Sequence, residues 1–151
     1  MVIPGGPQGI EATMALKTLV LFSLLVLGLL VIVGAQPPAF KRFQERHMDT
    51  GPGPFDPPYC NKTMYQRNLL KRNFNTFVHE SLKDVHDVCW EENYIFKNRT
   101  CNNCHKSSNR MSITECSIIG RNPIRYRTKN SKKYIVIACD GIWPVHFDGS
   151  E

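Results

Sequence analysis

The segment Trp143-Pro144-Val145-His146-Phe147-Asp148, near the C-terminus, places a carboxylate two positions after a histidine. A histidine on a short apolar, strand-like run can be oriented by such a carboxylate and then exchange a proton near neutral pH. This is the chemistry of a general acid or a general base. A histidine in a strand is more often structural than catalytic, so the segment alone is weak evidence for an acid–base site.

Three other segments strengthen the interpretation: Phe43-Gln44-Glu45-Arg46-His47-Met48-Asp49, Asn75-Thr76-Phe77-Val78-His79-Glu80 and Met111-Ser112-Ile113-Thr114-Glu115-Cys116. Together, and in this order, they resemble the pancreatic-type (ribonuclease A) superfamily over residues 40–148. The resemblance implies an α+β fold in which three short helices pack on a bent antiparallel β-sheet stapled by disulfides. It also implies cleavage of RNA.

Cutting RNA requires neither a metal nor a cofactor, because the ribose 2′-hydroxyl can attack its own phosphate. A base must take the proton of that hydroxyl, and an acid must protonate the departing 5′-oxygen. The resemblance assigns His47 as the base and His146 as the acid, with Asp148 hydrogen-bonded to His146. We therefore expect both histidines to face one cleft.

The resemblance also implies a set of residues that bind the substrate. Thr76, with Asn75 beside it, matches the residue that pairs with a pyrimidine edge, and Phe147 matches the ring that packs beside that base. Asn103 matches a side chain that contacts the downstream base. Further expected contacts are acidic residues near the base sites, Asp140 and Glu115, and cations for outlying phosphates, Lys97 and Arg42.

The segment before Asn75 departs from the family motif C-K-x-x-N-T-F, whose lysine stabilises the transition state. Here the sequence is Leu70-Lys71-Arg72-Asn73-Phe74-Asn75, so Arg72 holds the expected offset and Lys71 lies one residue too early. A preorganised donor at such a place is worth about 3–4 kcal/mol. A shifted cation could lose most of that, so we expect reduced activity, with Arg72 the nominal replacement and Lys71 nearly as plausible. A second departure is Arg46 before His47, which adds a cation near the phosphate and could lower the pKa of His47.

Six cysteines, an even number, predict disulfides in an oxidising compartment: Cys60, Cys89, Cys101, Cys104, Cys116 and Cys139. The sequence alone does not choose among the possible pairings. The resemblance implies Cys60–Cys116 and Cys89–Cys139, with Cys101 as a relocated partner for Cys104. A fourth family bridge is missing at both ends, which would free the loop that carries Lys71 and Arg72.

Cys101-Asn102-Asn103-Cys104-His105 also fits the C-x-x-C-H pattern of haem attachment, and C-x-x-C can be a redox motif or half of a zinc site. Once the two long bridges form, no second cysteine pair remains for zinc. A strand–helix redox context is also lacking, so a structural bridge is the favoured interpretation.

The first 35 residues have the pattern of a secretory signal peptide. Residues 18–35 carry no charge, Lys17 precedes them, and Val33-Gly34-Ala35 is a small-residue cleavage signature. Met14 is a more natural start than Met1, so residues 1–13 could be an upstream extension. A signal anchor is the alternative, because 18 uncharged residues could just span a bilayer of about 30 Å.

Cleavage after Ala35 leaves residues 36–151 as one secreted, extracellular domain. It retains 18 Lys and Arg against 12 Asp and Glu, a net charge of +6 with histidines neutral. Such a cation is attracted to polyanions. We therefore expect a monomeric endoribonuclease that cuts single-stranded RNA after pyrimidines. Other candidate partners are a ribonuclease inhibitor, anionic membranes and glycosaminoglycans. The second hypothesis is a host-defence or binding protein whose catalysis is dispensable.

The elements that must position these residues can be read from periodicity. Helices are predicted over residues 40–49, 59–71 and 81–89, the last with Ser81 as its N-cap. Strands are predicted over residues 74–79, 94–97, 110–118, 124–128, 134–139 and 144–147. The sequons Asn61-Lys62-Thr63 and Asn98-Arg99-Thr100 predict glycans on Asn61 and Asn98.

Overall fold

The computed structural model describes residues 8–53, 55–95 and 101–151. The chain forms two compact units, Met1–Ala35 and Gln36–Glu151. This boundary coincides with the predicted cleavage site after Ala35, although removal of the first unit stays a prediction.

The first unit contains one helix, α1 (Gln8–Gly34). Its segment Ala12–Leu29 has a mean hydropathy of 2.0 and is long and apolar enough to cross a membrane. An N-terminal apolar helix of this kind fits a signal peptide, and its length and composition fit a membrane anchor equally well.

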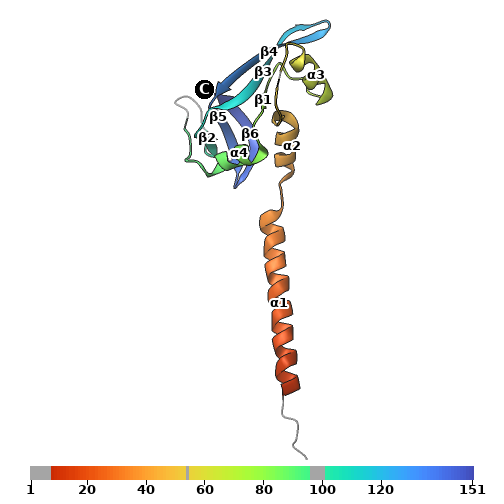
Figure 1. Cartoon of the computed structure of the whole chain (residues 1–151), viewed down its shortest axis with the longest axis vertical. Coiled ribbons are helices and arrows are strands. Elements are labelled where there is room, and N and C mark those ends of the chain that lie inside the picture. Colours follow the sequence, from red (N-terminus) through yellow and green to blue (C-terminus); the bar gives the residue numbers. More distant parts are fainter. Residues whose placement is uncertain (1–7, 54, 96–100) are drawn as a thin grey trace, which may run out of the picture. The chain divides into compact units, whose positions relative to one another are not determined.

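The second unit contains the remaining helices: α2 (Pro38–His47), α3 (Tyr59–Gln66), α4 (Leu82–Asp87) and a 3₁₀ turn, η1 (Val88–Trp90) (Figure 1). Prolines at the start of α2 suit the first helical turn, which needs no N–H donor. Phe40, Phe43 and His47 recur every three to four residues and are buried on one face of α2. Ser81 caps α4 as predicted, because its Oγ accepts a hydrogen bond of 3.1 Å from the Asp84 N–H.

Helix α3 ends at Gln66, five residues before the predicted end at Lys71. Asn68 has a φ of +57°, a left-handed conformation that asparagine tolerates and that stops a helix. The next residue, Leu69, is still buried, and its N–H donates to the Met64 carbonyl at 2.8 Å. The early stop lets Lys71 and Arg72 form an irregular approach to the first strand.

The strands form two antiparallel sheets of three strands each. The first has the order β1-β3-β4 and the second β2-β5-β6. The strand bounds are β1 (Phe74–Val78), β2 (Cys104–Lys106), β3 (Met111–Arg121), β4 (Ile124–Lys133), β5 (Ile135–Asp140) and β6 (Trp143–Ser150). The predicted α+β class with antiparallel pairing is confirmed.

The strand predicted over residues 94–97 is wrong where the structure describes it. Tyr94 and Ile95 belong to no strand, and residues 96 and 97 lie outside the described residues. The Tyr94 N–H donates to the Cys104 carbonyl at 2.7 Å, next to an isolated bridge between Asn93 and His105. The strand at this edge is instead β2, which pairs with β5. Tertiary pairing has overridden the β propensity of Tyr94 and Ile95.

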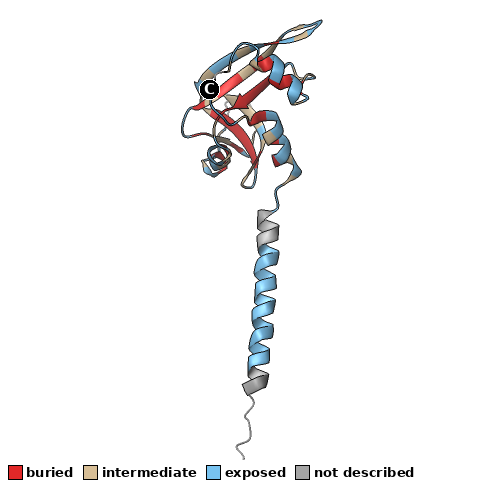
Figure 2. Cartoon of the chain, turned by 45° about the vertical axis from the view of Figure 1, so that its right-hand side comes forward, coloured by how far each residue is buried: buried red, intermediate tan, exposed pale blue. Residues whose placement is uncertain are grey.

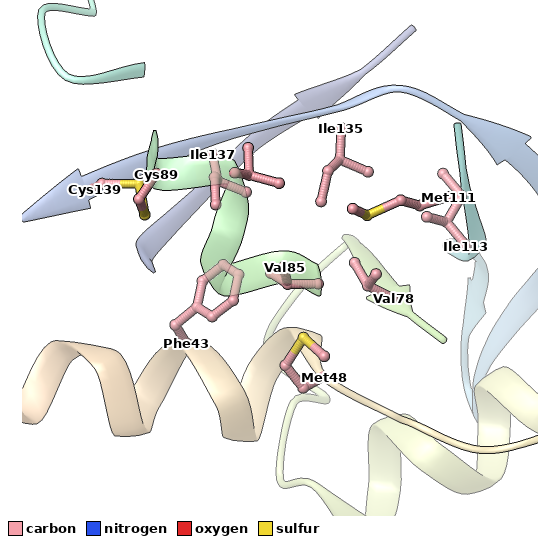
Figure 3. Packing of buried hydrophobic residues seen from close by; sticks show 11 residues of the cluster. Phe43, Met48, Val78, Val85, Cys89, Met111, Ile113, Ile135, Ile137 and Cys139 are labelled. Atoms are coloured by element: carbon pink, nitrogen blue, oxygen red, sulfur yellow. A yellow bond between two sulfur atoms is a disulfide. The ribbon is translucent and has the colours of Figure 1, made fainter. Parts of the chain in front are cut away.

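The buried residues lie where helices meet the sheets (Figure 2). The largest cluster gathers Phe43 and Met48 from α2 and its C-cap, Val85 from α4, and Ile135 and Ile137 from β5, whose side chains point toward one another (Figure 3). This cluster fixes the C-terminal end of α2, which carries His47, against the strands.

All six cysteines form disulfides: Cys60–Cys116, Cys89–Cys139 and Cys101–Cys104. This is the pairing that the family resemblance implies. The first two bridges close separations of 56 and 50 residues. In the loop-entropy model, each stabilises the fold by about 4 kcal/mol. They join the helices α3 and η1 to the strands β3 and β5.

Candidate active site

A cavity of about 530 Å³ opens between α2, the start of β1 and the end of β6. Its lining comes from four parts of the chain and comprises His47, Arg72, Phe74, Asn75, Thr76, Glu115, Phe147, Asp148, Gly149 and Ser150. Residues from all four sequence motifs thus meet with the divergent segment before Asn75. The cavity is therefore the place where acid–base chemistry can act on a bound substrate.

His47 is held in one tautomer by the backbone of β1. Its side chain is buried, and Nδ1 lies 2.9 Å from the Thr76 carbonyl oxygen. A carbonyl oxygen can only accept, so Nδ1 carries the proton and donates. The Phe147 ring stacks against the imidazole, with ring centroids 5.3 Å apart. Nε2 is thereby left with a lone pair, which a general base requires.

Burial, together with the positive charges of Arg72, His146 and Arg46, lowers the pKa of His47 from 6.5 to about 4. The hydrogen bond to Thr76 opposes this shift. The expected influence of Arg46 is present, but desolvation of the ring is the largest cause. The imidazole is therefore neutral, and able to accept a proton, at all pH values well above 4.

His146 lies on β6 beside two lining residues, Phe147 and Asp148. Its imidazole is 67% exposed and is not part of the cavity lining, but it lies near enough for its charge to lower the pKa of His47. Its Nε2 is 3.9 Å from Asp148 Oδ1. This separation exceeds a hydrogen bond, so the expected bond between the two side chains is not made and the contact is an ionic one. Nδ1 is the nitrogen left to donate a proton.

Arg72, rather than Lys71, reaches the cavity. The Arg72 side chain lines it and donates from Nη1 to Asn75 Oδ1 at 3.2 Å, whereas Lys71 is exposed and lies outside the lining. Asn75 in turn donates from Nδ2 to the Arg46 carbonyl at 2.8 Å. Asn75 is therefore placed to orient Arg72 and to tie β1 to α2. Partial burial, followed by repulsion from Arg46, lowers the pKa of Arg72.

The loop that carries Arg72 is held by hydrogen bonds, although the family bridge that would anchor it is missing. The buried Tyr126 on β4 donates from its hydroxyl to the Arg72 carbonyl at 2.6 Å. A side-chain hydrogen bond also joins Arg121 to Asn73. The expectation that loss of the bridge frees this loop is therefore not met at these residues.

The expected base-binding residues surround the same cavity. Thr76 is buried on β1 and pairs with Glu115 of β3, and Phe147 lines the same cavity. The Glu115 carboxylate accepts hydrogen bonds from Ser150 Oγ at 3.2 Å and from Lys133 Nζ at 3.3 Å. These two hydrogen bonds fix the position of the Glu115 side chain in the cavity lining.

Asn103 and Asp140 lie outside the cavity lining, at the end of β5. The Asn103 side chain donates from Nδ2 to the Cys139 carbonyl at 2.9 Å, and Asp140 follows as an exposed residue. Arg42 and Arg46 are exposed on α2. Lys97 and Asn98 lie outside the described residues. Asn61 is exposed on α3, and its Oδ1 accepts from the Tyr126 N–H at 2.7 Å, which leaves Nδ2 for a glycan.

Cys101, Cys104 and Asp148 offer donor atoms within 4.8 Å of one another. The two sulfurs are joined in a disulfide and so provide no thiolate for a metal and no thiol for haem attachment. The zinc and haem interpretations of C-x-x-C-H therefore do not fit these residues.

The lining residues Phe74, Gly149 and Ser150, and His79 at the end of β1, were not assigned from sequence. Phe74 lines the cavity and is 52% exposed, which is unusual for a phenylalanine. Its spacing of two residues from Thr76 in a strand indicates that both side chains lie on the same face. His79 is buried at the end of β1, where Nδ1 lies 2.9 Å from the Asp49 carbonyl and Nε2 lies 2.6 Å from Thr114 Oγ1. Burial lowers the pKa of His79. His79 is not part of the cavity lining, and its hydrogen bonds give it a structural role.

Comparison with known proteins agrees with this geometry. A family model described as pancreatic ribonuclease matches residues 38–148. Pancreatic ribonuclease of Lagothrix lagotricha is 45% identical over 148 residues, covering 89% of this chain and 94% of the relative. The gamma-type pancreatic ribonuclease of Rattus norvegicus is 43% identical over 149 residues, covering 89% and 97% of the two chains. Pancreatic ribonuclease of Lemur catta is 43% identical over 148 residues, covering 89% and 94%. The family match over residues 38–148 and these identities show that the chain belongs to the pancreatic ribonuclease family.

Proposed function

We propose that this protein is a secreted endoribonuclease that cleaves single-stranded RNA on the 3′ side of pyrimidines. The observation that carries the proposal is the pairing of His47, which lines the cavity, with His146, which lies beside two lining residues and has a different environment. His47 is buried, neutral and fixed with Nε2 available, whereas His146 is exposed beside the Asp148 carboxylate. The apolar helix α1 supports secretion.

In the first step, His47 Nε2 takes the proton of the ribose 2′-hydroxyl. The 2′-oxygen attacks the adjacent phosphorus, and the bond from phosphorus to the 5′-oxygen of the next nucleotide breaks. His146 Nδ1 donates its proton to that departing oxygen, which leaves a 2′,3′-cyclic phosphate. In the second step, His146 removes a proton from water, the hydroxide opens the ring, and His47 returns its proton to the 2′-oxygen.

Arg72 is the cation available to the phosphate as negative charge builds on it. Its guanidinium lines the cavity beside His47 and is oriented by Asn75. A planar guanidinium hydrogen-bonded to an amide is not equivalent to a free ammonium at a crowded phosphate. We therefore propose that the enzyme cuts RNA more slowly than relatives that keep the lysine.

Thr76 and Phe147 support the preference for pyrimidines. The Thr76 side chain offers a hydroxyl on the wall of the cavity, and Phe147 presents a ring beside it. A hydroxyl that both donates and accepts can pair with either uracil or cytosine.

Product analysis with a single-stranded RNA that contains all four bases tests the proposal. We expect fragments that end in pyrimidine 2′,3′-cyclic phosphates, which convert slowly to 3′-phosphates. Cleavage after purines, or products with 5′-phosphate ends, would contradict it. RNA binding without cleavage would favour the alternative of a binding protein with the ribonuclease fold.

A further inference from the structure

The C-x-x-C segment has no part in the proposed mechanism, yet it lies on the same side of the sheet as the proposed acid. Cys104 begins β2, where it pairs with Ala138 of β5, and Ala138 pairs with His146 of β6. Residues directly opposite one another in antiparallel strands point to the same side. Cys104 and His146 therefore share one face of the sheet β2-β5-β6 (Figure 1), two strand spacings or about 10 Å apart.

The Asp148 carboxylate lies between this disulfide and the acid. It has an oxygen within 4.8 Å of both Cys101 Sγ and Cys104 Sγ, and its Oδ1 lies 3.9 Å from His146 Nε2. The Asp148 side chain is only 15% exposed, so its neighbours hold it in this position. A chemical change at either sulfur therefore takes place next to the carboxylate that contacts His146.

The two sulfurs of this disulfide differ in their access to solvent. Cys104 is fully buried in a cluster with Val136 and Ala138, whereas Cys101 is partly exposed. A thiolate from solution can thus reach the sulfur of Cys101, and Cys104 is then the leaving group. The other two disulfides are less accessible, because all four of their cysteines are buried.

The Cys101–Cys104 bridge also closes a much shorter loop than the other two, with a sequence separation of 3 against 56 and 50. In the loop-entropy model, the stabilisation that a bridge gives grows with its loop, so the fold loses least when this bridge opens. The opened form has acceptors in place for both thiols. Cys101 Sγ lies 3.6 Å from Asn103 Oδ1, and the Asp148 carboxylate lies near Cys104 Sγ.

We propose that the Cys101–Cys104 bridge is a covalent modification site for low-molecular-weight thiols, and that its opening slows RNA cleavage through Asp148. The second part rests on the proposed function, whereas the first does not. In the opened form, a Cys104 thiol that donates to the Asp148 carboxylate competes with His146 for it. The acid then loses the ionic contact that orients it.

The exchange balances as follows for a thiol RSH. The thiolate RS⁻ attacks Cys101 Sγ, the bond between the two cysteine sulfurs breaks, and Cys104 leaves as a thiolate that takes a proton from water. Cys101 then carries RS in a mixed disulfide. A second RS⁻ attacks the RS sulfur and releases the Cys101 thiolate, which is also protonated. Two RSH are thereby oxidised to RSSR while the bridge is reduced.

The first measurement locates the modification. The folded, secreted protein is exposed to graded concentrations of glutathione, its free thiols are trapped with iodoacetamide, and the products are mapped by peptide mass. We expect glutathione on Cys101 and the trapping label on Cys104, at glutathione concentrations about tenfold or more below those that open the long bridges. Opening of all three bridges at one concentration, glutathione on Cys104 instead of Cys101, or no modification of the folded protein would overturn the proposal.

The second measurement is cleavage of a uridine-containing dinucleotide at a dithiothreitol concentration that opens only this bridge. We expect kcat to fall about two- to fivefold, the factor that an exposed ionic contact contributes. Reoxidation with oxidised glutathione should restore kcat. The Cys101→Ser/Cys104→Ser variant keeps both long bridges, should cleave at the rate of the opened protein, and should respond to neither reagent. An unchanged kcat in the opened protein would overturn the link to the acid.

Asp148→Asn tests whether the carboxylate transmits the effect. Its rate should be the same with the bridge open or closed, because changes that act through one group do not add. A two- to fivefold loss on opening in this variant too would overturn the role of Asp148 and assign the effect to the segment 101–103. Absence of cleavage by the parent protein would defeat the proposed function instead, while the glutathione mapping, which needs no turnover, still decides the modification site.

Discussion

Among single side chains, Arg72 stands at the family lysine's offset from Asn75 and is a cation that lines the cavity. Phe74 and Thr76 share one face of β1, and the irregular segment before the strand brings Arg72 to the cavity that all three residues line. Lys71 is exposed and lies outside the lining. The hydrogen bond from Arg72 to Asn75 then fixes the guanidinium beside His47.

We expect Arg72→Ala to lower cleavage of a uridine-containing dinucleotide at least tenfold, since it removes the cation that faces the phosphate. Lys71→Ala is the matched control and should have a smaller effect. Affinity of both variants for single-stranded RNA should fall only modestly. Steady-state kinetics of the parent protein and the two variants measure this. If both variants cleaved at the parent rate, neither cation would act at the phosphate.

The buried environment of His47 predicts an unusual pH dependence. The base must be neutral to act, and burial lowers its pKa from 6.5 to about 4. The acid limb of a bell-shaped profile of kcat/KM against pH should therefore lie near pH 4 rather than near 6.5, while the alkaline limb reports loss of the proton from the acid. Arg46→Gln removes a charge that lowers this pKa, so the acid limb should move to higher pH. A limb that stays near 6.5 in the parent protein would contradict the buried geometry.

At the level of strands and loops, Tyr126 helps to hold the loop that the missing disulfide would anchor. Its hydroxyl bonds the Arg72 carbonyl from across the sheet at 2.6 Å. We expect Tyr126→Phe to reduce stability by about 1–2 kcal/mol, the cost of leaving a buried acceptor unsatisfied. It should also lower kcat more than it raises KM, because Arg72 would lose its fixed position.

Chemical denaturation and kinetics of Tyr126→Phe, compared with Tyr65→Phe, measure both effects. Tyr65 is 73% exposed on α3, so its hydroxyl should contribute little to stability. If Tyr126→Phe matched this control in both stability and kcat, the loop would be held by other contacts.

Local pattern predicts the elements that carry the site and fails where distant contacts decide. The period of α2 puts His47 in place and the alternation of β1 puts Thr76 in place, whereas Arg72 lies in the irregular segment before β1. The end of α3 depended on the backbone conformation of Asn68, and β2 exists because β5 offers it an edge. Similarly, the hydrogen bonds of Tyr126 and the tautomer of His47 require contacts between residues far apart in the sequence, which no local pattern contains.

For the molecule as a whole, the boundary between its two units matches the predicted cleavage site. We expect secreted material to begin at Gln36 and to contain no titratable thiol, since all six cysteines are paired. Intact mass and thiol titration check the two parts separately. Retention of residues 1–35 would identify α1 as an anchor, and two thiols would show that the Cys101–Cys104 bridge does not form.

In the proposed mechanism, His47 and His146 act together on the phosphodiester, one as the base and the other as the acid. The most direct measurement is the cleavage rate of a uridine-containing dinucleotide by the parent protein, His47→Ala and His146→Ala. We predict measurable cleavage by the parent and loss of nearly all of it in each variant, because each step needs one base and one acid. A His146→Ala rate equal to that of the parent, or a parent rate no higher than that of His47→Ala, would contradict the mechanism.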